Sequence, residues 1–203
     1  MGERPYPQKG DTLFQGGPDI QLNADISHWN KDLSGYARGY KDAADFIIKG
    51  AIENPESHTF NVSYLVFSVV FLYRQYIELR LKETILLGNR LKGEQHGFPK
   101  HHRIDEIWKH ARRYMEDVAP KGPHDELDAL EACIKEFSQL DPDGMAFRYP
   151  VDREGKPHLP EWSVINLRHL KETMERVGHL LDDTTEVMYI YLQQQNELGG
   201  EYY

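Results

Sequence analysis

The sequence has few of the features that mark secreted, disulfide-bonded or membrane-spanning proteins. Its 203 residues include one cysteine, Cys133, so no internal disulfide can form and we expect a reducing, cytoplasmic setting. The most apolar run, at 64–73, is well short of the roughly 20 residues that cross a bilayer. No apolar signal segment follows Met1. We therefore predict a cytoplasmic protein without a membrane partner.

Motifs of the common catalytic and metal sites are also missing. The sequence has no Gly-rich phosphate loop, no Gly-x-Ser-x-Gly elbow and no His-Glu-x-x-His helix. Glu94 and His96 have only weak ligand spacing, so we predict neither a metal site nor a cofactor. Cys133 lies among apolar residues at helical spacing, which predicts a buried thiol rather than a nucleophile.

The charge is acidic overall but uneven along the chain. A formal net charge of −9 argues against a surface coated with basic residues for nucleic acid. The segment 74–113 differs, because it carries ten Lys and Arg residues against five Asp and Glu residues. Such a segment could hold a phosphate-bearing ligand, or it could pack against the acidic part of the same chain or of a second copy. We favour packing.

Apolar residues recur at helical spacing along most of the chain, and no segment shows the alternation of a strand. Five helices are predicted, at about 34–52, 59–87, 103–118, 125–140 and 163–198. The second helix is apolar on nearly all sides in its first half, so we place it at the centre of a bundle. Gly88-Asn89 is expected to end it.

The predicted fold class is an all-α antiparallel bundle with a long C-terminal helix and an irregular insert at about 141–162. In this insert, 153–156 is the expected tip of a hairpin-like turn. Residues 1–33 show no period and are predicted to form an extended arm on a bundle of 34–203. The arm is expected to clip onto the core through Tyr6, Phe14, Ile20 and Trp29.

Charged residues on the central helix share one stripe. Arg74, Glu78 and Lys82 fall at i, i+4 and i+8. The stripe could be an intrahelical ladder at the edge of the bundle, worth a few tenths of a kcal/mol per pair. It could instead hold a phosphate-bearing ligand, with Arg74 and Lys82 binding it and Glu78 orienting them. We favour the structural interpretation.

Two segments of the chain resemble the HEPN superfamily. Tyr76-Ile-Glu-Leu-Arg-Leu-Lys82, a loop, and His102-Arg-Ile-Asp-Glu-Ile-Trp108 follow the order of that family's helix–loop–helix pattern. Three later stretches resemble a prokaryotic subgroup: Asp141-Pro142, Phe147-Arg-Tyr-Pro150 and Ile165-Asn-Leu167. The resemblance covers about 35–198 and implies an antiparallel bundle, usually a homodimer. Its members include metal-independent RNases of toxin–antitoxin, CRISPR and anti-phage systems, and catalytically silent nucleotide-binding or accessory proteins.

The family's RNase signature is an Arg followed, after four to six residues, by a His. Three pairs fit this spacing: Arg90/His96, Arg103/His110 and Arg153/His158. Arg153 is the one followed by the expected polar residue, Glu154, and this pair precedes the final helix, as in the family. Gly155 and Pro157 lie between the two residues and predict a loop in place of the family's helical turn.

The resemblance implies roles for this pair. His158 would act as general base on a 2′-hydroxyl or as general acid on the leaving oxygen, and Arg153 would stabilise charge on the phosphate. Dimerisation would bring two such pairs together over one strand. His101 and His102 are a second source of acid–base groups, although the sequence predicts no partner that would orient them.

Three functions remain open at the level of sequence. The first is an RNase of a prokaryotic defence or toxin–antitoxin system. The second is a silent module that binds a nucleotide or a partner encoded by a neighbouring gene. The third is a plain interaction protein whose apolar faces build a dimer. The predicted ligand-binding residues are Arg74, Glu78, Lys82, His101, His102 and Arg103.

Overall fold

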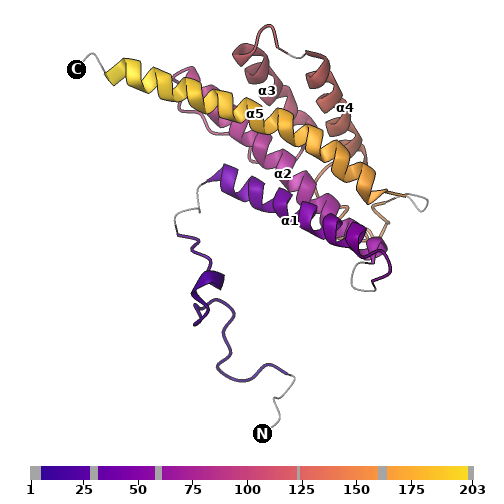
Figure 1. The fold of residues 1–203 in the computed structure, drawn as a ribbon. Helices are drawn as coiled ribbons and strands as arrows, with labels where there is room; N and C mark the ends of the chain where they lie inside the picture. The colour runs from indigo at the N-terminus through magenta and orange to yellow at the C-terminus, as the bar shows by residue number, and fades with distance from the viewer. Residues whose placement is uncertain (1–5, 28–31, 58–60, 123, 160–163, 201–203) are drawn as a thin grey trace. The chain divides into compact units, whose positions relative to one another are not determined.

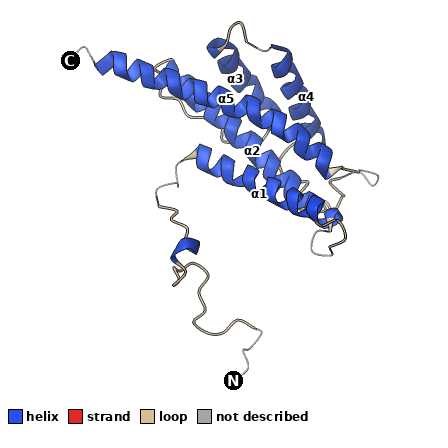
Figure 2. Ribbon diagram, in the orientation of Figure 1, coloured by secondary structure: helices blue, strands red, loops and turns tan. Residues whose placement is uncertain are grey.

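The computed structural model describes residues 6–27, 32–57, 61–122, 124–159 and 164–200. Their regular structure is helical, and no strand occurs among them (Figure 2). The α-helices are α1 (Leu33–Glu53), α2 (Val62–Leu91), α3 (Ile104–Val118), α4 (His124–Leu140) and α5 (Leu167–Gly200). The predicted all-α bundle with a long C-terminal helix is therefore confirmed.

Helix α2 is the centre of the bundle, as its sequence predicts. It packs against α1, α3 and α5, while α4 packs on α3 (Figure 1). Almost every residue of α2 from Val69 to Asn89 is buried or half-buried, because apolar residues occupy most of its faces. Charged residues in this stretch are consequently buried as well, and each of them needs a partner.

Polar side chains tie α2 to its neighbours. The Tyr73 hydroxyl donates a hydrogen bond to Asp45 on α1 over 2.6 Å. The Tyr76 hydroxyl donates to Asp182 on α5 over 2.7 Å, and Arg80 Nε lies 2.9 Å from the same carboxylate. Helices α1 and α5 are thus fixed on α2 by side-chain hydrogen bonds in addition to apolar packing.

The predicted end of the second helix at Gly88-Asn89 is wrong, because α2 continues to Leu91. A Cβ atom on Gly88 would lie 2.2 Å from the Tyr114 ring, so this glycine permits the close approach of α3. The Asn89 side chain accepts a hydrogen bond from the Tyr114 hydroxyl and donates to the His96 and Gly97 carbonyls. Both residues therefore fix neighbouring segments while remaining helical.

The final helix starts later than the predicted position near 163. Residues 160–163 lie outside the described residues, 164–166 are not helical, and α5 begins at Leu167. The Asn166 side chain accepts a hydrogen bond from the His169 backbone N–H over 3.0 Å. This bond is the N-cap interaction that Asn commonly supplies at the start of a helix.

Residues Met1–Asp32 form a separate unit with few internal contacts. A short 3-10 turn at Ile20–Leu22 is its regular element. The predicted clipping of Tyr6, Phe14 and Ile20 onto the bundle stays a prediction, and Trp29 lies outside the described residues. Within the described part of the chain, no helix has the length and apolar character needed to cross a membrane.

Candidate functional site

The charged stripe of α2 lies inside the molecule. Arg74 has no exposed surface, and the exposed fractions of Glu78 and Lys82 are 2% and 5%. Glu78 pairs with both neighbours, at 3.3 Å to Arg74 Nη1 and 2.8 Å to Lys82 Nζ. The predicted ladder therefore exists, but its predicted position at the edge of the bundle is wrong. Removing one partner of a buried pair of this kind strongly destabilises the fold, because the remaining charge is left in the core without compensation.

Arg74 also binds two loops that are distant in sequence. Its Nε donates to the Asp141 carbonyl over 3.2 Å and lies 3.3 Å from that residue's carboxylate. Its Nη2 donates to the His102 carbonyl over 2.7 Å and to the Pro142 carbonyl over 3.5 Å. One guanidinium thus fixes the loop before α3 and the turn after α4 on the central helix.

Close approach of the 141–144 turn to Arg74 requires a glycine. Gly144 has a φ of +75°, a left-handed backbone conformation that residues with a Cβ atom seldom adopt. A Cβ atom at this position would lie 2.7 Å from Arg74 Nη1. Asp141 stabilises the same turn, because its Oδ1 accepts a hydrogen bond from the Ala146 N–H over 2.8 Å.

His102 completes the buried charge network, by which we mean Arg74, Glu78, Lys82, His102 and Asp141. Its Nδ1 lies 2.8 Å from Glu78 Oε1, while 60% of its side chain is exposed. Burial raises the pKa of Glu78, but the hydrogen bonds and charges of Lys82 and His102 outweigh that effect and leave this pKa below its ordinary value. The carboxylate is therefore ionised at neutral pH.

No pattern in the sequence indicated that Glu78 would orient His102. The two residues are 24 positions apart, beyond the reach of helical periodicity. Among the histidines that the structure describes, His102 is the one whose ring nitrogen binds a buried carboxylate. An orienting partner of this kind is a common feature of acid–base histidines.

The other two predicted ligand-binding residues of this loop face a different partner. Arg103 Nη2 lies 2.9 Å from Glu106, and His101 Nε2 lies 3.6 Å from the same carboxylate. Glu106 belongs to the first turn of α3, whose N-terminus favours acidic residues. The structure therefore brings together Arg74, Glu78, Lys82 and His102, and it places His101 and Arg103 around Glu106. The ligand-binding role of all six residues stays a prediction.

Arg153 and His158 lie on a short hairpin, in a loop, as Gly155 and Pro157 predict. An isolated antiparallel bridge joins Val151 to Pro157, and the His158 N–H donates to the Pro150 carbonyl over 3.2 Å. At the tip, Asp152 Oδ1 accepts backbone hydrogen bonds from Glu154 and Lys156 over 2.8 and 2.9 Å. These bonds hold the pKa of Asp152 below its ordinary value.

The hairpin and the 141–144 turn line one groove of about 710 Å³, which we call the hairpin groove. Both candidate catalytic residues line it, together with Asp141, Pro142, Tyr149 and Asp152. Its volume lies within the range of small-molecule pockets. Because Arg74 holds the backbone of Asp141 and Pro142, one wall of the groove is anchored in the core.

Much of the positive charge of segment 74–113 is neutralised within the chain. At least six of its ten bases form ion pairs: Arg74, Arg80, Lys82, Lys92, Arg103 and Arg112. Arg112 binds three carboxylates of α3 and α4, which raises its pKa. The favoured packing interpretation holds for the four bases that pair with acidic residues outside the segment: Arg74, Arg80, Lys92 and Arg112. Lys82 and Arg103 pair with Glu78 and Glu106, which lie inside it.

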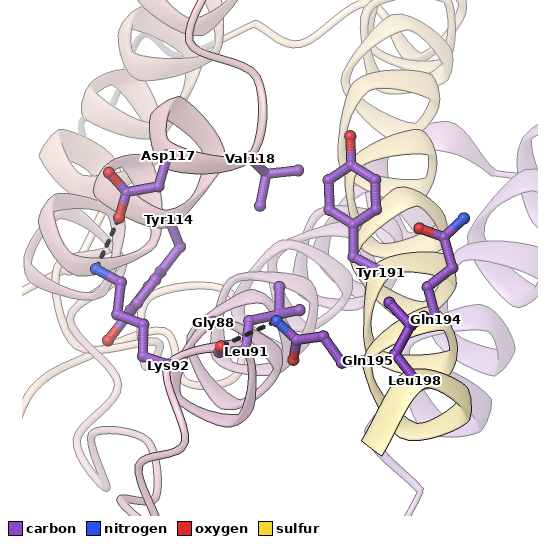
Figure 3. Close-up of a pocket in the computed structure, with 10 residues that line it drawn as sticks. All are labelled: Gly88, Leu91, Lys92, Tyr114, Asp117, Val118, Tyr191, Gln194, Gln195 and Leu198. Carbon is purple, nitrogen blue, oxygen red and sulfur yellow. Dashed lines mark hydrogen bonds and ion pairs between the residues drawn. The ribbon is translucent and has the colours of Figure 1, made fainter. Parts of the chain in front are cut away.

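A second pocket of about 370 Å³ lies between the C-terminal ends of α2, α3 and α5 (Figure 3). Tyr114 and Tyr191 line opposite sides, and Gln194 follows Tyr191 along α5. Lys92 lies over the Tyr114 ring, 4.8 Å from its centre, and pairs with Asp117 over 2.7 Å. The sequence alone does not predict this pocket, because its walls come from three separate helices.

Two further predictions concern metal ions and the thiol. Among the described residues, no three His, Cys, Asp or Glu side chains cluster closely enough to hold a metal ion. Cys133 is half-buried on α4, and burial raises its pKa, so the thiol is not activated as a nucleophile.

Comparison with other proteins gives no match. Neither a protein-family model, nor a curated protein, nor a solved structure is similar to this chain at a significant level. The HEPN resemblance therefore stays a prediction from short sequence patterns.

Proposed function

We propose that the protein is a HEPN-like endoribonuclease that cleaves RNA at the hairpin groove. The observation that carries this proposal is the position of Arg153 and His158, which line one groove from a hairpin of defined shape. Metal-independent RNA cleavage needs an acid–base group and a cation close to one phosphate. His158 supplies the first and Arg153 the second.

Three aspartates line the groove; Asp143 is exposed, while Asp141 and Asp152 are compensated within the chain. Asp141 is paired with Arg74, and the Asp152 carboxylate accepts two backbone N–H groups of its own turn. Their negative charge is therefore partly compensated within the chain. Arg153 lines the groove and is exposed, so its guanidinium can meet a phosphate.

The biological setting follows from the same resemblance. We propose a prokaryotic defence or toxin–antitoxin role in the cytoplasm, with two copies of the chain forming the active unit. A homodimer would place two Arg153/His158 pairs over one RNA strand, as the resemblance implies.

RNA cleavage by the purified chain in the presence of a chelator tests the proposal. We expect the wild-type protein to cleave single-stranded RNA, and His158→Ala to lower the rate by about 10²–10⁴-fold, the usual contribution of general acid–base catalysis. Arg153→Ala should lower it to a similar extent. His110→Ala is the matched control, since His110 belongs to another Arg/His pair within the four-to-six-residue range and is exposed on α3. Equal rates for His158→Ala and His110→Ala would reject the proposal.

A second candidate function is ligand binding without catalysis. The pocket in Figure 3 favours it, because two tyrosine rings and the amide groups of Gln194 and Gln195 surround a volume suited to a planar ligand. A nucleotide that binds the purified chain, and whose affinity falls in Tyr191→Ala but not in His158→Ala, would support this function. Arg74→Ala is a poor test of it, since this buried residue supports the fold.

A further inference from the structure

We propose that His102 is a second acid–base group of this protein, positioned for proton transfer by the buried carboxylate of Glu78. The inference rests on the proposed RNase function and adds to it a residue outside the Arg153/His158 pair. In this proposal, His102 is the base that removes the proton of the 2′-hydroxyl, and His158 is the acid.

The chemistry of the pair fixes the protonation of the ring. An ionised carboxylate can only accept hydrogen bonds, so His102 Nδ1 must carry a proton when it binds Glu78 Oε1 at 2.8 Å. In the neutral imidazole the other nitrogen, Nε2, then holds a lone pair and can accept a proton. The pairing therefore selects the tautomer that a general base requires.

Glu78 and His102 differ in how far their side chains are buried. Glu78 is almost completely buried, whereas most of the His102 side chain is exposed. Lys82 Nζ binds the same oxygen as His102, Glu78 Oε1, over 2.8 Å, and Arg74 Nη1 binds the other oxygen, Oε2, over 3.3 Å. A carboxylate fixed in this way orients the imidazole, and the exposed part of the ring can meet a ligand.

The charged groups around His102 form a balanced set. Arg74, Lys82, Glu78 and Asp141 contribute two positive and two negative charges. Next to His102 in sequence, His101 and Arg103 face Glu106 of α3. The carboxylate in direct contact with the ring is Glu78, and it stabilises the imidazolium that forms when the base takes a proton.

The network also connects His102 with the hairpin groove. Arg74 Nη2 binds the His102 carbonyl and the Pro142 carbonyl, and Pro142 lines the groove. The backbone of His102 is therefore anchored beside the wall that carries Asp141 and Pro142.

The proposed step balances with the two histidines alone. His102 Nε2 takes the proton of the 2′-hydroxyl while the 2′-oxygen attacks phosphorus, and the bond from phosphorus to the 5′-oxygen breaks. His158 gives its proton to that 5′-oxygen. The products are a 2′,3′-cyclic phosphate and a 5′-hydroxyl, and proton exchange with water restores both histidines.

Nitrogen-15 NMR of the histidine rings tests the pairing without any measurement of activity. We expect neutral His102 in the wild-type chain to carry its proton on Nδ1, and Glu78→Gln to give a mixture of both tautomers, because an amide can also donate a hydrogen bond. His96 is the matched control, since its Nδ1 faces the exposed Glu94 at 3.3 Å. A wild-type His102 with its proton on Nε2 would overturn the inference.

RNA cleavage then tests the role in catalysis. We expect His102→Ala to lower kcat by about 10²–10⁴-fold with little change in KM, and His96→Ala to leave both unchanged. His102→Asn keeps a hydrogen-bond donor for Glu78, so this variant should fold like the wild type. Its side chain cannot transfer a proton, so it should cleave RNA as slowly as His102→Ala.

The two proposals can fail separately. If His158→Ala abolishes cleavage while His102→Asn cleaves at the wild-type rate, the inference is wrong and the proposed function stands. If the wild-type chain cleaves no RNA, the proposed function and the catalytic role of His102 are both wrong. The NMR measurement still decides whether Glu78 orients His102.

Discussion

Arg74 and Arg153 are held in opposite ways, although both belong to regions of this chain that carry candidate site residues. Arg74 has no exposed surface and binds two loops and Glu78 through its guanidinium. Arg153 is exposed on a hairpin whose shape comes from backbone hydrogen bonds and from Asp152. The first arrangement serves the fold, while the second leaves a cation available to a ligand.

The buried charge network and the hairpin differ in how much stability the loss of one side chain is expected to cost. In the buried charge network, the loss of one partner leaves another charge in the core without compensation. In the hairpin, the loss of the Arg153 or His158 side chain leaves the backbone hydrogen bonds and those of Asp152 in place. His102 lies between these extremes, because one ring nitrogen binds the network and most of the ring is exposed.

Replacing Arg74 should have the largest effect on stability. Arg74→Met leaves the buried Glu78 and Asp141 without their shared cation, so we expect the free energy of unfolding to fall by about 3–5 kcal/mol. Urea denaturation followed by circular dichroism measures it. A loss below about 1 kcal/mol, within the usual range of surface changes, would contradict the burial of this network.

Two glycines with similar backbone angles allow a matched test. Gly144 and Gly155 have φ of +75° and +81°, but a Cβ atom would meet Arg74 at 2.7 Å in the first and nothing within 4 Å in the second. Gly155→Ala should lose about 1 kcal/mol through backbone strain alone. Gly144→Ala should lose about 3 kcal/mol, because overpacking adds to the same strain. Equal losses of stability in thermal denaturation would show that a Cβ atom at position 144 does not clash with Arg74.

The pH dependence of stability should also distinguish the two regions. The pKa of Glu78 and the pKa of Asp152 are both lowered in the folded chain. A lowered pKa contributes stability above the unfolded value, near 4 for these groups, and this contribution is lost as the pH falls through the folded pKa.

We expect Glu78→Gln to flatten the stability profile below about pH 4.5. Asp152→Asn should change it less, because solvent screens the exposed Asp152 carboxylate. Urea unfolding between pH 2 and 7 at fixed ionic strength is the measurement. If Asp152→Asn changed the pH dependence of stability more than Glu78→Gln does, the expected difference between the buried network and the hairpin would be wrong.

The smallest effect on stability is expected for the candidate catalytic pair. The double variant Arg153→Ala/His158→Ala should change the free energy of unfolding by no more than about 0.5 kcal/mol, since Arg153 is exposed and His158 is only half-buried. Thermal denaturation with circular dichroism is sufficient. A loss above 1 kcal/mol would mean that the pair supports the fold, and cleavage assays on it would then need the single variants.

Local sequence patterns predicted most of the fold. The apolar faces of α1, α3 and α4 placed these helices within a few residues of their observed bounds, because helical periodicity depends on neighbours three and four residues apart. The end of α2 was missed, since Gly88 and Asn89 are stop signals in isolation and become packing residues only beside Tyr114.

The candidate site was less predictable than the fold. Spacing alone identified the stripe of Arg74, Glu78 and Lys82, and the turn signals at 153–157 predicted the loop that carries Arg153. The partner of His102 and the groove that contains His158 were not predictable. Both depend on segments that meet only after the helices have packed.

The sequence by itself determined the helical class, the central position of α2 and the turn between Arg153 and His158, because each depends on the preferences of nearby residues. Only the tertiary structure decided which charges meet. Arg74 reaches Asp141 across 67 positions and Glu78 reaches His102 across 24. A buried charge must find its partner wherever the packed helices bring one within hydrogen-bonding distance, and no local pattern records that position.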